Sequence, residues 1–448
     1  MQLTTTMVPE LSEGGKAAAD NMPELFKIFA KLMADPYNRE TNPGGILNAG
    51  VAINGTIRQL LVDKLNTMDT HFVPTDLEYS APQGTPALRA EIASMLNRHF
   101  EPATAVTPED VAVNNGCTAA IEMLAFAMCN PGDHILVPAP LYLALPSDMG
   151  TRARAQLTPV HVPLELAADC AQVALFERAV HDVSAAGGRV RALFLTNPAN
   201  PLGTVYPRAV VRALLRFASA HGLFVISDEI YGLSEFRRGA KDVEPFESLL
   251  SWHDLADYID PRAVVILHGL SKDFGLNGFR VGWIVSPWNK RLMQAVVTYA
   301  PFGFTSSHTQ RLLTMLLADH PFVDNLLHES HARLADNYAV AAAFFYVREI
   351  QYVAASAGHF VWLRLPISAC AKMLRNTEKA CACHCALAGL EWTKEREFDM
   401  AMHLMDRYAL YMPPGQAFYS SEAGWFRFTF AICREELDIA LQRLESAI

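Results

Sequence analysis

The sequence lacks the features that mark nucleic-acid-binding and membrane proteins. It has no run of basic residues, and its 37 Lys and Arg are outnumbered by 47 Asp and Glu, which gives a formal net charge of −10. A chain of this charge does not attract phosphate backbones or anionic lipid. Its longest apolar stretch, residues 339–347, is too short to span a bilayer. We therefore expect neither a nucleic-acid partner nor a membrane partner.

Signals for secretion and for metal binding are also missing. The first residues show no charged start followed by an apolar core, so we expect no secretory segment. Eight cysteines are scattered along the chain, which predicts reduced thiols and a cytoplasmic protein. The Cys-Ala-Cys-His-Cys segment at 381–385 resembles no common zinc site, because adjacent ligands on one short segment cannot all face one ion. A helical turn with small apolar thiols is the preferred interpretation, and we expect no metal.

What the sequence does have is enough apolar residues for more than one core. It contains 448 residues, of which 51% are hydrophobic and 19% charged, and this predicts two folded units. Between about residues 115 and 286, short apolar runs alternate with helical stretches such as 119–129 and 207–221. This alternation predicts a mainly parallel sheet covered on both faces. The predicted strands are HILVPAP (134–140), RALFLTNP (191–198), LFVISDEIY (223–231) and AVVILHGLSK (263–272).

The last third of the chain has a different pattern. A helical stretch, 322–349, precedes two apolar runs, FVWLRL at 360–365 and WFRFTFAI at 425–432. These runs predict strands of a smaller α+β unit. The predicted domains are an N-terminal segment that packs with the smaller unit, a large unit and a C-terminal small unit, at 1–68, 69–322 and 323–448.

Polar residues follow two neighbouring predicted strands. Asp228 and Tyr231 end one of them, and Ser271-Lys272 ends the other. Ligands of such sheets bind beyond the carboxyl ends of the strands. A lysine there is partly desolvated, which lowers its pKa and suits it to act as a nucleophile or base. An aspartate on a neighbouring strand end could pair with a ring-nitrogen cation, although for either residue taken alone a surface salt bridge is the favoured explanation.

Three longer motifs resemble those of the aminotransferases of class I and II, which depend on pyridoxal 5′-phosphate. Asn-Pro-Ala-Asn-Pro-Leu-Gly at 197–203 is similar to their NPxNPxG turn, 227–231 to their SDEIY segment and 271–282 to their SKxxGLxGxRxG segment. The order and spacing hold from roughly residue 40 to the end. The resemblance implies the α/β fold type I of aspartate aminotransferase, with a mainly parallel seven-stranded sheet in the large domain and a smaller α+β domain. It also implies a homodimer with shared active sites.

The resemblance assigns roles to the matching positions around the cofactor ring. Lys272 would form the Schiff base with the cofactor and later move the substrate Cα proton. Asp228 would pair with the ring nitrogen. Tyr231 and Asn200 would hydrogen-bond the 3′-oxygen of the ring, and Tyr142 would stack on the ring face.

The cofactor phosphate is expected at the start of the helix near Thr118. Free backbone N–H groups at Cys117 and Thr118, which follow Gly116, together with the helix dipole, favour an anion there. Arg280 would add positive charge and Ser271 a hydroxyl.

Two further positions bear on the phosphate. Tyr79 would reach the phosphate of the partner subunit's cofactor. The family commonly has Ser three residues before the lysine, whereas this chain has Gly269 with His268 beside it. We expect that one phosphate contact is lost or that His268 supplies it.

Arg427 matches the arginine that binds the substrate α-carboxylate. A planar guanidinium can donate two parallel hydrogen bonds to a carboxylate, which a lysine cannot do. The alternative is an arginine that faces the surface while its neighbours Phe426 and Phe428 are buried. The substrate-binding residues implied are Arg427, Asn200, Tyr79 and Ile53.

Within this family the chain most resembles the branch that contains the ACC synthases. The similar segments are 42–61, 303–319 and 419–431. Two positions depart from the plant enzymes. These carry Glu before the Asn matched by Asn54, where this chain has Ile53, and they usually carry Tyr where it has Pro82. A site without this acidic group and this aromatic group should hold a sulfonium cation less well.

The same branch includes fungal C–S lyases of sulfur-containing natural-product pathways. We therefore expect an enzyme of secondary metabolism that acts on an α-amino acid or a cysteine conjugate and cleaves its Cβ–S bond by β-elimination. An aminotransferase that passes an amino group to a 2-oxo acid is the alternative, because the same residues serve both reactions. An ACC synthase-type γ-elimination and a catalytically silent protein are less favoured, the latter because Lys272, Asp228, Tyr231 and Arg427 are intact.

Overall fold

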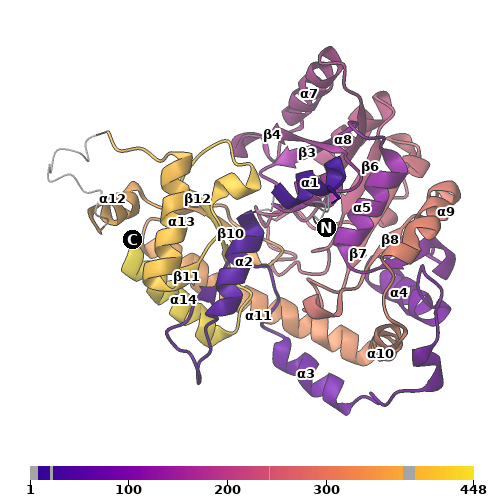
Figure 1. Ribbon diagram of the computed structural model, residues 1–448, viewed down its shortest axis with the longest axis horizontal. Helices are drawn as coiled ribbons and strands as arrows, with labels where there is room; N and C mark the ends of the chain where they lie inside the picture. The colour runs from indigo at the N-terminus through magenta and orange to yellow at the C-terminus, as the bar shows by residue number, and fades with distance from the viewer. Residues whose placement is uncertain (1–8, 21–23, 242, 377–388) are drawn as a thin grey trace, which may run out of the picture.

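The computed structural model describes residues 9–20, 24–241, 243–376 and 389–448, which form two units side by side (Figure 1). The Cys-Ala-Cys-His-Cys segment at 381–385 lies outside these residues, so the interpretation given to it stays a prediction. The five cysteines within them are all free thiols. No helix in the described part of the chain is both long and apolar enough to cross a bilayer.

The larger unit is built on a seven-stranded sheet, as predicted. The strand order is β2-β8-β7-β6-β5-β3-β4, with β8 antiparallel to both of its neighbours and the other pairs parallel. The strands are β2 (Val111–Asn114), β3 (His134–Ala139), β4 (Gln156–His161), β5 (Val190–Thr196), β6 (Phe224–Asp228), β7 (Val264–Gly269) and β8 (Gly282–Val285).

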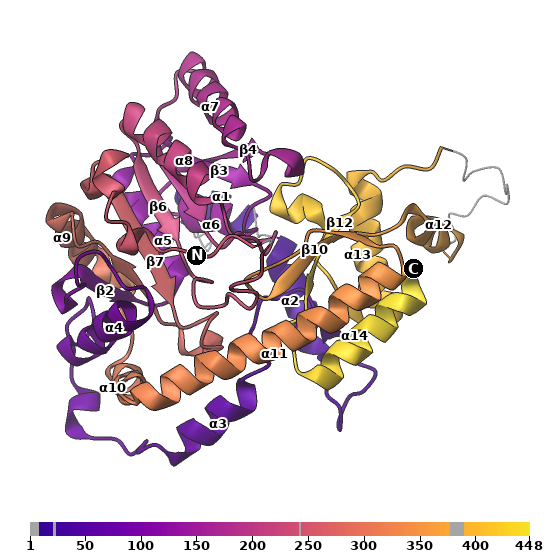
Figure 2. The same cartoon turned by 180° about the vertical axis from the view of Figure 1, so that it is seen from behind.

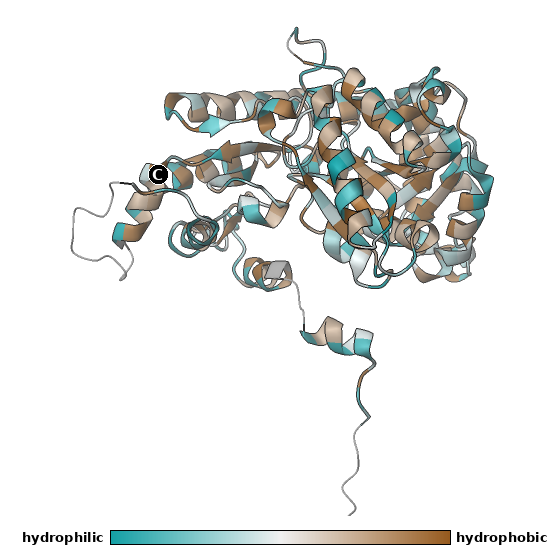
Figure 3. Cartoon of the chain, turned by 90° about the horizontal axis from the view of Figure 1, so that it is seen from above, coloured by the Kyte–Doolittle hydropathy of each residue, from teal (hydrophilic) through white to brown (hydrophobic). Residues whose placement is uncertain are grey.

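Alternate residues of the central strands enter two different cores. In β7, Val264 and Ile266 pack on one face of the sheet, whereas Val265 and Leu267 pack on the other. All four are fully buried, which explains why this strand is an uninterrupted apolar run. In the hydropathy colours of Figure 3 the strands of this sheet are largely brown.

Helices cover both faces of the sheet. One face is covered by α5 (Cys117–Met128), α6 (Leu145–Gly150) and α9 (Lys290–Tyr299). The other is covered by α4 (Pro86–His99), α7 (Val173–Ala185), α8 (Arg208–Ala220) and α10 (Ser307–Ala318). In α8 the buried Val210, Leu214 and Phe217 are spaced to lie on one side of the helix, toward the core.

The smaller unit is an antiparallel sheet packed against helices. Its strand order is β12 (Trp425–Thr429), β10 (Phe360–Arg364) and β9 (Gln351–Tyr352). Its helices are α12 (Ile367–Asn376), α13 (Lys394–Tyr408) and α14 (Arg434–Ala447). The N-terminal part of the chain adds β1 (Leu47–Asn48), which pairs in parallel with β11 (Leu410–Tyr411). Two helices precede β1: α2 (Glu24–Ala34) packs Leu32 against this unit, whereas α1 (Glu13–Asp20) buries no residue.

Two helices show how the units are joined. The long helix α11 (His320–Val347) runs along both of them (Figure 2). It buries Leu326 in the core of the larger unit and Phe345 in that of the smaller one. Leu61 of α3 (Arg58–Thr67) packs with the larger unit. We propose the domain division 1–68, 69–322 and 323–448, with α3 as the part of the first segment that packs on the larger unit.

The predicted strands of the large sheet extend too far at three carboxyl ends. β5 stops at Thr196 because Pro198 has no N–H for the ladder. β6 stops at Asp228 and β7 at Gly269, and tight turns follow, closed by the Gly232 N–H on the Glu229 carbonyl and the Gly275 N–H on that of Lys272. Tyr231 and Lys272 therefore lie in turns beyond the sheet.

Candidate active site

The carboxyl ends of β5, β6 and β7 bring most of the predicted site residues to one pocket. Thr196 pairs with Asp228, and Asp228 with Leu267, so the turns after these strands lie side by side. The pocket is lined by Cys117, Thr118, Ile121, Tyr142, Asp148, Asn200, Asp228, Ile230, Tyr231, Ser271, Lys272, Asn277 and Arg280. Nine of the predicted residues are in this set; Gly116 adjoins it as the residue that caps α5.

Lys272 presents its amine at this pocket. Its Nζ donates a hydrogen bond of 2.7 Å to the Ala52 carbonyl. Burial, and then the positive charge of Arg427, lower the pKa of this amine to about 8. An amine with this pKa is partly neutral near pH 7 to 8, as a nucleophile or a base must be.

Asp228 lies buried at the end of β6. The Thr196 hydroxyl donates to its Oδ2 at 3.2 Å. Burial raises its pKa to about 6. A carboxylate enclosed in this way is stabilised by a cation, and the ring nitrogen implied by the resemblance would provide one. The adjacent Glu229 points elsewhere, into hydrogen bonds with Ser227, Ser248 and the Leu249 N–H.

Two aromatic rings hold Tyr231 in a fixed orientation. The rings of His359 and Phe360 meet it edge-on, with centroids 5.4 and 5.3 Å away and interplanar angles of 90° and 87°. Burial raises the pKa of the Tyr231 hydroxyl, which therefore acts as a neutral hydrogen-bonding group. Tyr142, half-buried, lines the same pocket.

The start of α5 forms a cradle that suits a phosphate. Gly116 has φ 85°, and a Cβ at this position would overlap the Arg280 guanidinium. Glycine thus lets Arg280 approach the free N–H groups of the helix. The backbone of Arg280 is in the left-handed conformation (φ 55°), and its guanidinium donates a hydrogen bond of 3.0 Å to the Asn277 carbonyl. Backbone donors, a helix dipole and a guanidinium at one point fit an anion.

The missing serine at Gly269 is not replaced by His268. The His268 ring is fully buried and its Nε2 bonds Asp273 at 3.0 Å, so it does not line the pocket. A Cβ at Gly269 would lie 3.2 Å from Cys117 Sγ, which donates to the His268 carbonyl. The thiol therefore occupies the space next to Gly269. His268 is therefore not placed to supply a phosphate contact, and the loss of that contact stays a prediction.

Arg427 is buried rather than facing the surface, with 4% of its surface exposed. Its guanidinium donates to Asn200 Oδ1 at 2.8 Å and to the Gly50 carbonyl. The rings of Phe360 and Phe418 lie 4.9 and 4.8 Å from it. Asn200, a lining residue of the pocket, therefore connects Arg427 to the pocket. The amide nitrogen of Asn200 stays available to donate to a ligand.

Ile53 lies beside the pocket without lining it. It is half-buried and follows Ala52, whose carbonyl accepts from Lys272. The residue that follows this carbonyl in the chain is thus apolar.

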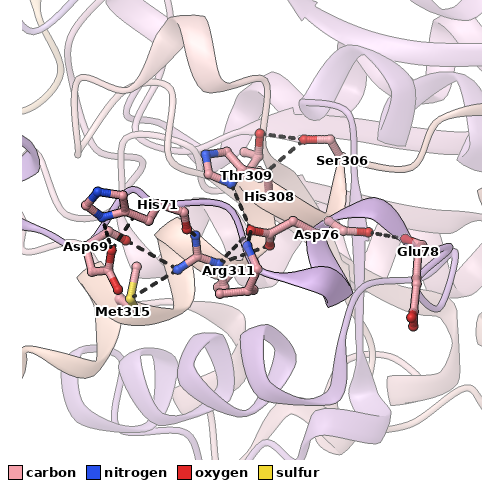
Figure 4. Close-up of polar contacts among 11 residues, drawn as sticks. Asp69, His71, Asp76, Glu78, Ser306, His308, Thr309, Arg311 and Met315 are labelled. Carbon is pink, nitrogen blue, oxygen red and sulfur yellow. Dashed lines mark hydrogen bonds and ion pairs between the residues drawn. The ribbon is translucent and has the colours of Figure 1, made fainter.

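Tyr79 is the predicted site residue that the chain does not bring to the pocket. It is 97% exposed, and its neighbours Phe72 and Leu77 are also exposed. The segment that carries these residues is nevertheless firmly held. Figure 4 shows the side chain of Asp76 pointing toward His308 and Arg311.

The Asp76 carboxylate anchors this segment to α10. Arg311 Nε donates to both of its oxygens, at 3.0 and 3.1 Å, and His308 Nδ1 lies 3.2 Å from Oδ2. The bond from Arg311 lowers the pKa of Asp76 to about 2. Arg311 also donates to the His71 carbonyl at 2.6 Å. These bonds of Asp76 and Arg311 thus fix the backbone of the segment from which Tyr79 projects.

One charged residue of the pocket was missed by the sequence analysis. Asp148, on α6, lines the pocket beside Thr118 and Arg280. Burial raises its pKa to about 7. It belongs to none of the quoted motifs, and its position six residues after Tyr142 was the one signal that could have suggested it.

Comparison with protein families agrees with this geometry. The pattern of the family "Aminotransferase class I and II" matches residues 64–444. A 1-aminocyclopropane-1-carboxylate synthase, CMW33 of Cucurbita maxima, is 31% identical over 424 residues, which cover 92% of this chain and 80% of that protein. The probable aminotransferase gliI of Aspergillus fumigatus is 31% identical over 416 residues, covering 90% of this chain and 89% of its own.

Solved structures share the fold. Aspartate aminotransferase from Thermus thermophilus with maleate superposes with a TM-score of 0.70, covering 98% of this chain and 100% of that one. The identity is 20%, so this likeness concerns the fold alone.

Proposed function

The chain belongs to the aminotransferase class I and II family and is a pyridoxal-phosphate enzyme, and from this premise we propose that it cleaves the Cβ–S bond of a cysteine conjugate. The proposed substrate is an α-amino acid with a sulfur leaving group on Cβ, used in secondary metabolism. With uptake of one water, the products are a thiol, pyruvate and ammonia. The observation that carries the proposal is a Lys272 amine of lowered pKa, bonded to the Ala52 carbonyl one residue before the apolar Ile53.

The residues of the pocket suit each part of the cofactor. Lys272 would hold it covalently, and Asp228 would keep the ring nitrogen protonated. Tyr231 and the amide nitrogen of Asn200 would donate to the ring oxygen. The phosphate would lie at the start of α5 beside Arg280. When bound, pyridoxal phosphate supplies a sink for the electron pair left at the substrate Cα.

The chain's own residues would perform the remaining steps. Arg427 binds the α-carboxylate through two parallel hydrogen bonds, which orients the Cα–H bond toward Lys272. Lys272 Nζ removes the Cα proton, and its lowered pKa makes it a base near neutral pH. As the Cβ–S bond breaks, the electron pair of that bond leaves with sulfur, and the ammonium of Lys272 can return the proton taken from Cα to the departing thiolate.

The choice of a neutral sulfur substrate rests on two side chains. Ile53 and Pro82 stand where the resembling plant enzymes carry an acidic and an aromatic residue. A cationic sulfonium gains nothing from these apolar groups, whereas a thioether is not penalised by them. This favours β-elimination from a cysteine conjugate over the γ-elimination of the ACC synthases.

Transamination is the second candidate, and the likeness to a relative named a probable aminotransferase favours it. The same lysine, aspartate and arginine would serve it, because the two reactions differ in the fate of the electron pair at Cα. Of these two reactions, only transamination is open to a substrate without a leaving group on Cβ.

The two candidates are separated by products. The holoenzyme is incubated with S-substituted cysteines, and thiol and pyruvate are measured; each turnover should release one of each. The matched control is the corresponding amino acid with the sulfur replaced by CH₂, which should release neither. Transfer of the amino group to a 2-oxo acid from S-substituted cysteines, without thiol release, would overturn the lyase proposal and support the aminotransferase.

Assembly and location belong to the same proposal. We propose a homodimer in which Tyr79 completes the partner's site; the exposure of Tyr79, Phe72 and Leu77 supports it, because exposed apolar clusters mark interfaces. The free thiols of the described cysteines support a location in the reducing cytoplasm.

A further inference from the structure

Four buried polar side chains lie behind the pocket and have no part in the chemistry above. His268, Asp273, Ser234 and His359 each have 0% of their surface exposed. Asp273 Oδ2 accepts from His268 Nε2 at 3.0 Å and from the Leu233 N–H at 2.9 Å, and its Oδ1 accepts from the Ser234 hydroxyl. The Ser234 oxygen lies 3.1 Å from His359 Nε2.

This network joins the segments that carry the reactive groups of the larger unit. Asp273 directly follows Lys272. Ser234 lies in the turn after β6, and its N–H donates to the Tyr231 carbonyl at 3.0 Å. The bond between Asp273 and Ser234 therefore ties the turn of the lysine to the turn of the tyrosine.

His359 adds the smaller unit to the network. It immediately precedes β10, and its ring meets the Tyr231 ring edge-on. The next residue, Phe360, contacts both Tyr231 and the Arg427 guanidinium. The three residues contact one another in a ring. The Ser234 N–H bonds the Tyr231 carbonyl, the Ser234 hydroxyl bonds His359, and the His359 ring packs on the Tyr231 ring.

The single proton of the Ser234 hydroxyl fixes the direction of these bonds. Asp273 is an acceptor toward three donors, so the Ser234 proton points to it. His359 Nε2 must then be the donor to Ser234. Burial, and then the charges of Lys272 and Arg427, lower the pKa of His359 to about 3, so the ring is neutral with its proton on Nε2.

We propose that His359 and Ser234 are positioning residues, which hold the Tyr231 hydroxyl and the Lys272 amine in register with Arg427 across the two units. Reacting groups must be held to within a fraction of an ångström, and small displacements cost rate even when they originate outside the pocket. The inference rests on the proposed cofactor site but not on which substrate bond is cleaved.

Three variants separate the ring of His359 from its hydrogen bond. His359→Phe keeps an aromatic ring against Tyr231 and removes the donor. His359→Gln removes the ring and keeps an N–H donor near the place of Nε2. Ser234→Ala removes the link between His359 and Asp273. The control is Ser286→Ala, which removes a buried hydroxyl bonded to the Val264 carbonyl. Val264 begins β7, so this hydroxyl lies at the end of the strand away from Lys272.

The measurements are kcat and KM, the thermal midpoint, and the pH midpoint of the visible absorbance of the bound cofactor. His359→Phe and Ser234→Ala should lower kcat on the order of tenfold with little change in KM, and should shift the pH midpoint. His359→Gln should recover most of both values, and Ser286→Ala should leave them unchanged. Should Ser234→Ala fail to fold, the two His359 variants carry the test, because they leave the bond between Ser234 and Asp273 in place.

Two results would overturn the inference. In the first, kcat and the pH midpoint of His359→Phe equal those of the natural protein. In the second, His359→Gln is impaired as much as His359→Phe, which would show that the donor is irrelevant. If the natural protein shows no cofactor absorbance at all, the proposed site fails and this inference with it; absorbance that the variants leave unmoved sinks the inference alone.

Discussion

The strand-end pocket and the Tyr79 segment differ in how much of the site one chain completes. In and beside the pocket, Asp228 and Arg427 are enclosed by the protein, and burial raises the pKa of Asp228 and lowers that of Arg427. Tyr79 is 97% exposed and touches none of these groups. The pocket is built by the register of the large sheet and its contact with the smaller unit, whereas the Tyr79 segment needs another surface to act on.

The segment that carries Tyr79 is exposed, but the ion pair between Asp76 and Arg311 keeps it ordered. The Asp76 side chain is 2% exposed beneath it and is held by Arg311. A rigid backbone with exposed apolar side chains loses little entropy when a partner covers it. The comparison therefore predicts that changes in the pocket act within one subunit, and that changes at Tyr79 act on the other.

The largest effect is expected in the pocket, at Lys272. Lys272→Ala removes both the covalent attachment and the base, so kcat should fall by about ten-thousandfold or more, and the visible absorbance of the bound cofactor should be lost. Steady-state rates and absorbance spectra measure this. The exposed Lys290→Ala is the matched control and should behave as the natural protein. A Lys272→Ala protein with normal rates would show that this pocket is not the active site.

The next effect is expected at Arg427, which Asn200 connects to the pocket. Arg427→Lys keeps the charge but loses the paired hydrogen bonds, so kcat/KM should fall about a hundredfold, mainly through KM. Arg364→Lys, on the neighbouring strand β10, is the control and should change little. An unchanged KM for Arg427→Lys would show that the carboxylate is bound elsewhere.

Complementation tests the other half of the comparison. Tyr79→Ala should lower activity about tenfold, less than Lys272→Ala, because the proposed contact of Tyr79 is with the phosphate of the partner's cofactor and not with the reacting atoms. Co-expressed with Lys272→Ala, it should yield mixed dimers with one intact site. Total activity should then reach about a quarter of that of the natural protein, well above that of the two variants mixed after purification. If co-expression gives no gain, Tyr79 acts within its own chain or not at all.

The smallest effect concerns Asp148 and depends on pH. Its pKa is raised to about 7, so the carboxyl is mostly neutral below that pH and negative above it, beside the proposed phosphate cradle. Repulsion should weaken cofactor binding as pH rises through 7. Asp148→Asn should bind like the natural protein at about pH 6 and a few-fold more tightly at about pH 8. Equilibrium dialysis measures the cofactor affinities of the variant and of the natural protein. Identical binding curves of the two proteins at both pH values would show that the charge of Asp148 does not act on the phosphate.

The sequence predicted the parts of the molecule whose position follows from the chain itself. The family motifs and the alternation of apolar runs located the strand ends, and with them Asp228, Tyr231 and Lys272. Strand boundaries were predicted too long because apolar residues continue into the turns, as Ile230 does after β6. The sheet ends where the backbone turns, which apolarity alone does not indicate.

Other features depend on contacts between distant segments. Asp148 and His359 belong to no motif, and α6 and the approach to β10 bring them to the site. Side chains alternate between the two faces of β7. The His268 side chain therefore points away from the pocket, toward Asp273, although His268 is next to Gly269 in the sequence. Neither fact can be read from spacing in the sequence.

The central claim is that the amine at position 272 carries the cofactor. It is tested most directly by treating the holoenzyme with borohydride, which makes the covalent link permanent, and by locating the modified peptide by mass spectrometry. The account predicts one modified lysine, in the peptide that contains Leu270-Ser271-Lys272-Asp273. Modification of a different lysine, or an active protein with none modified, would contradict it.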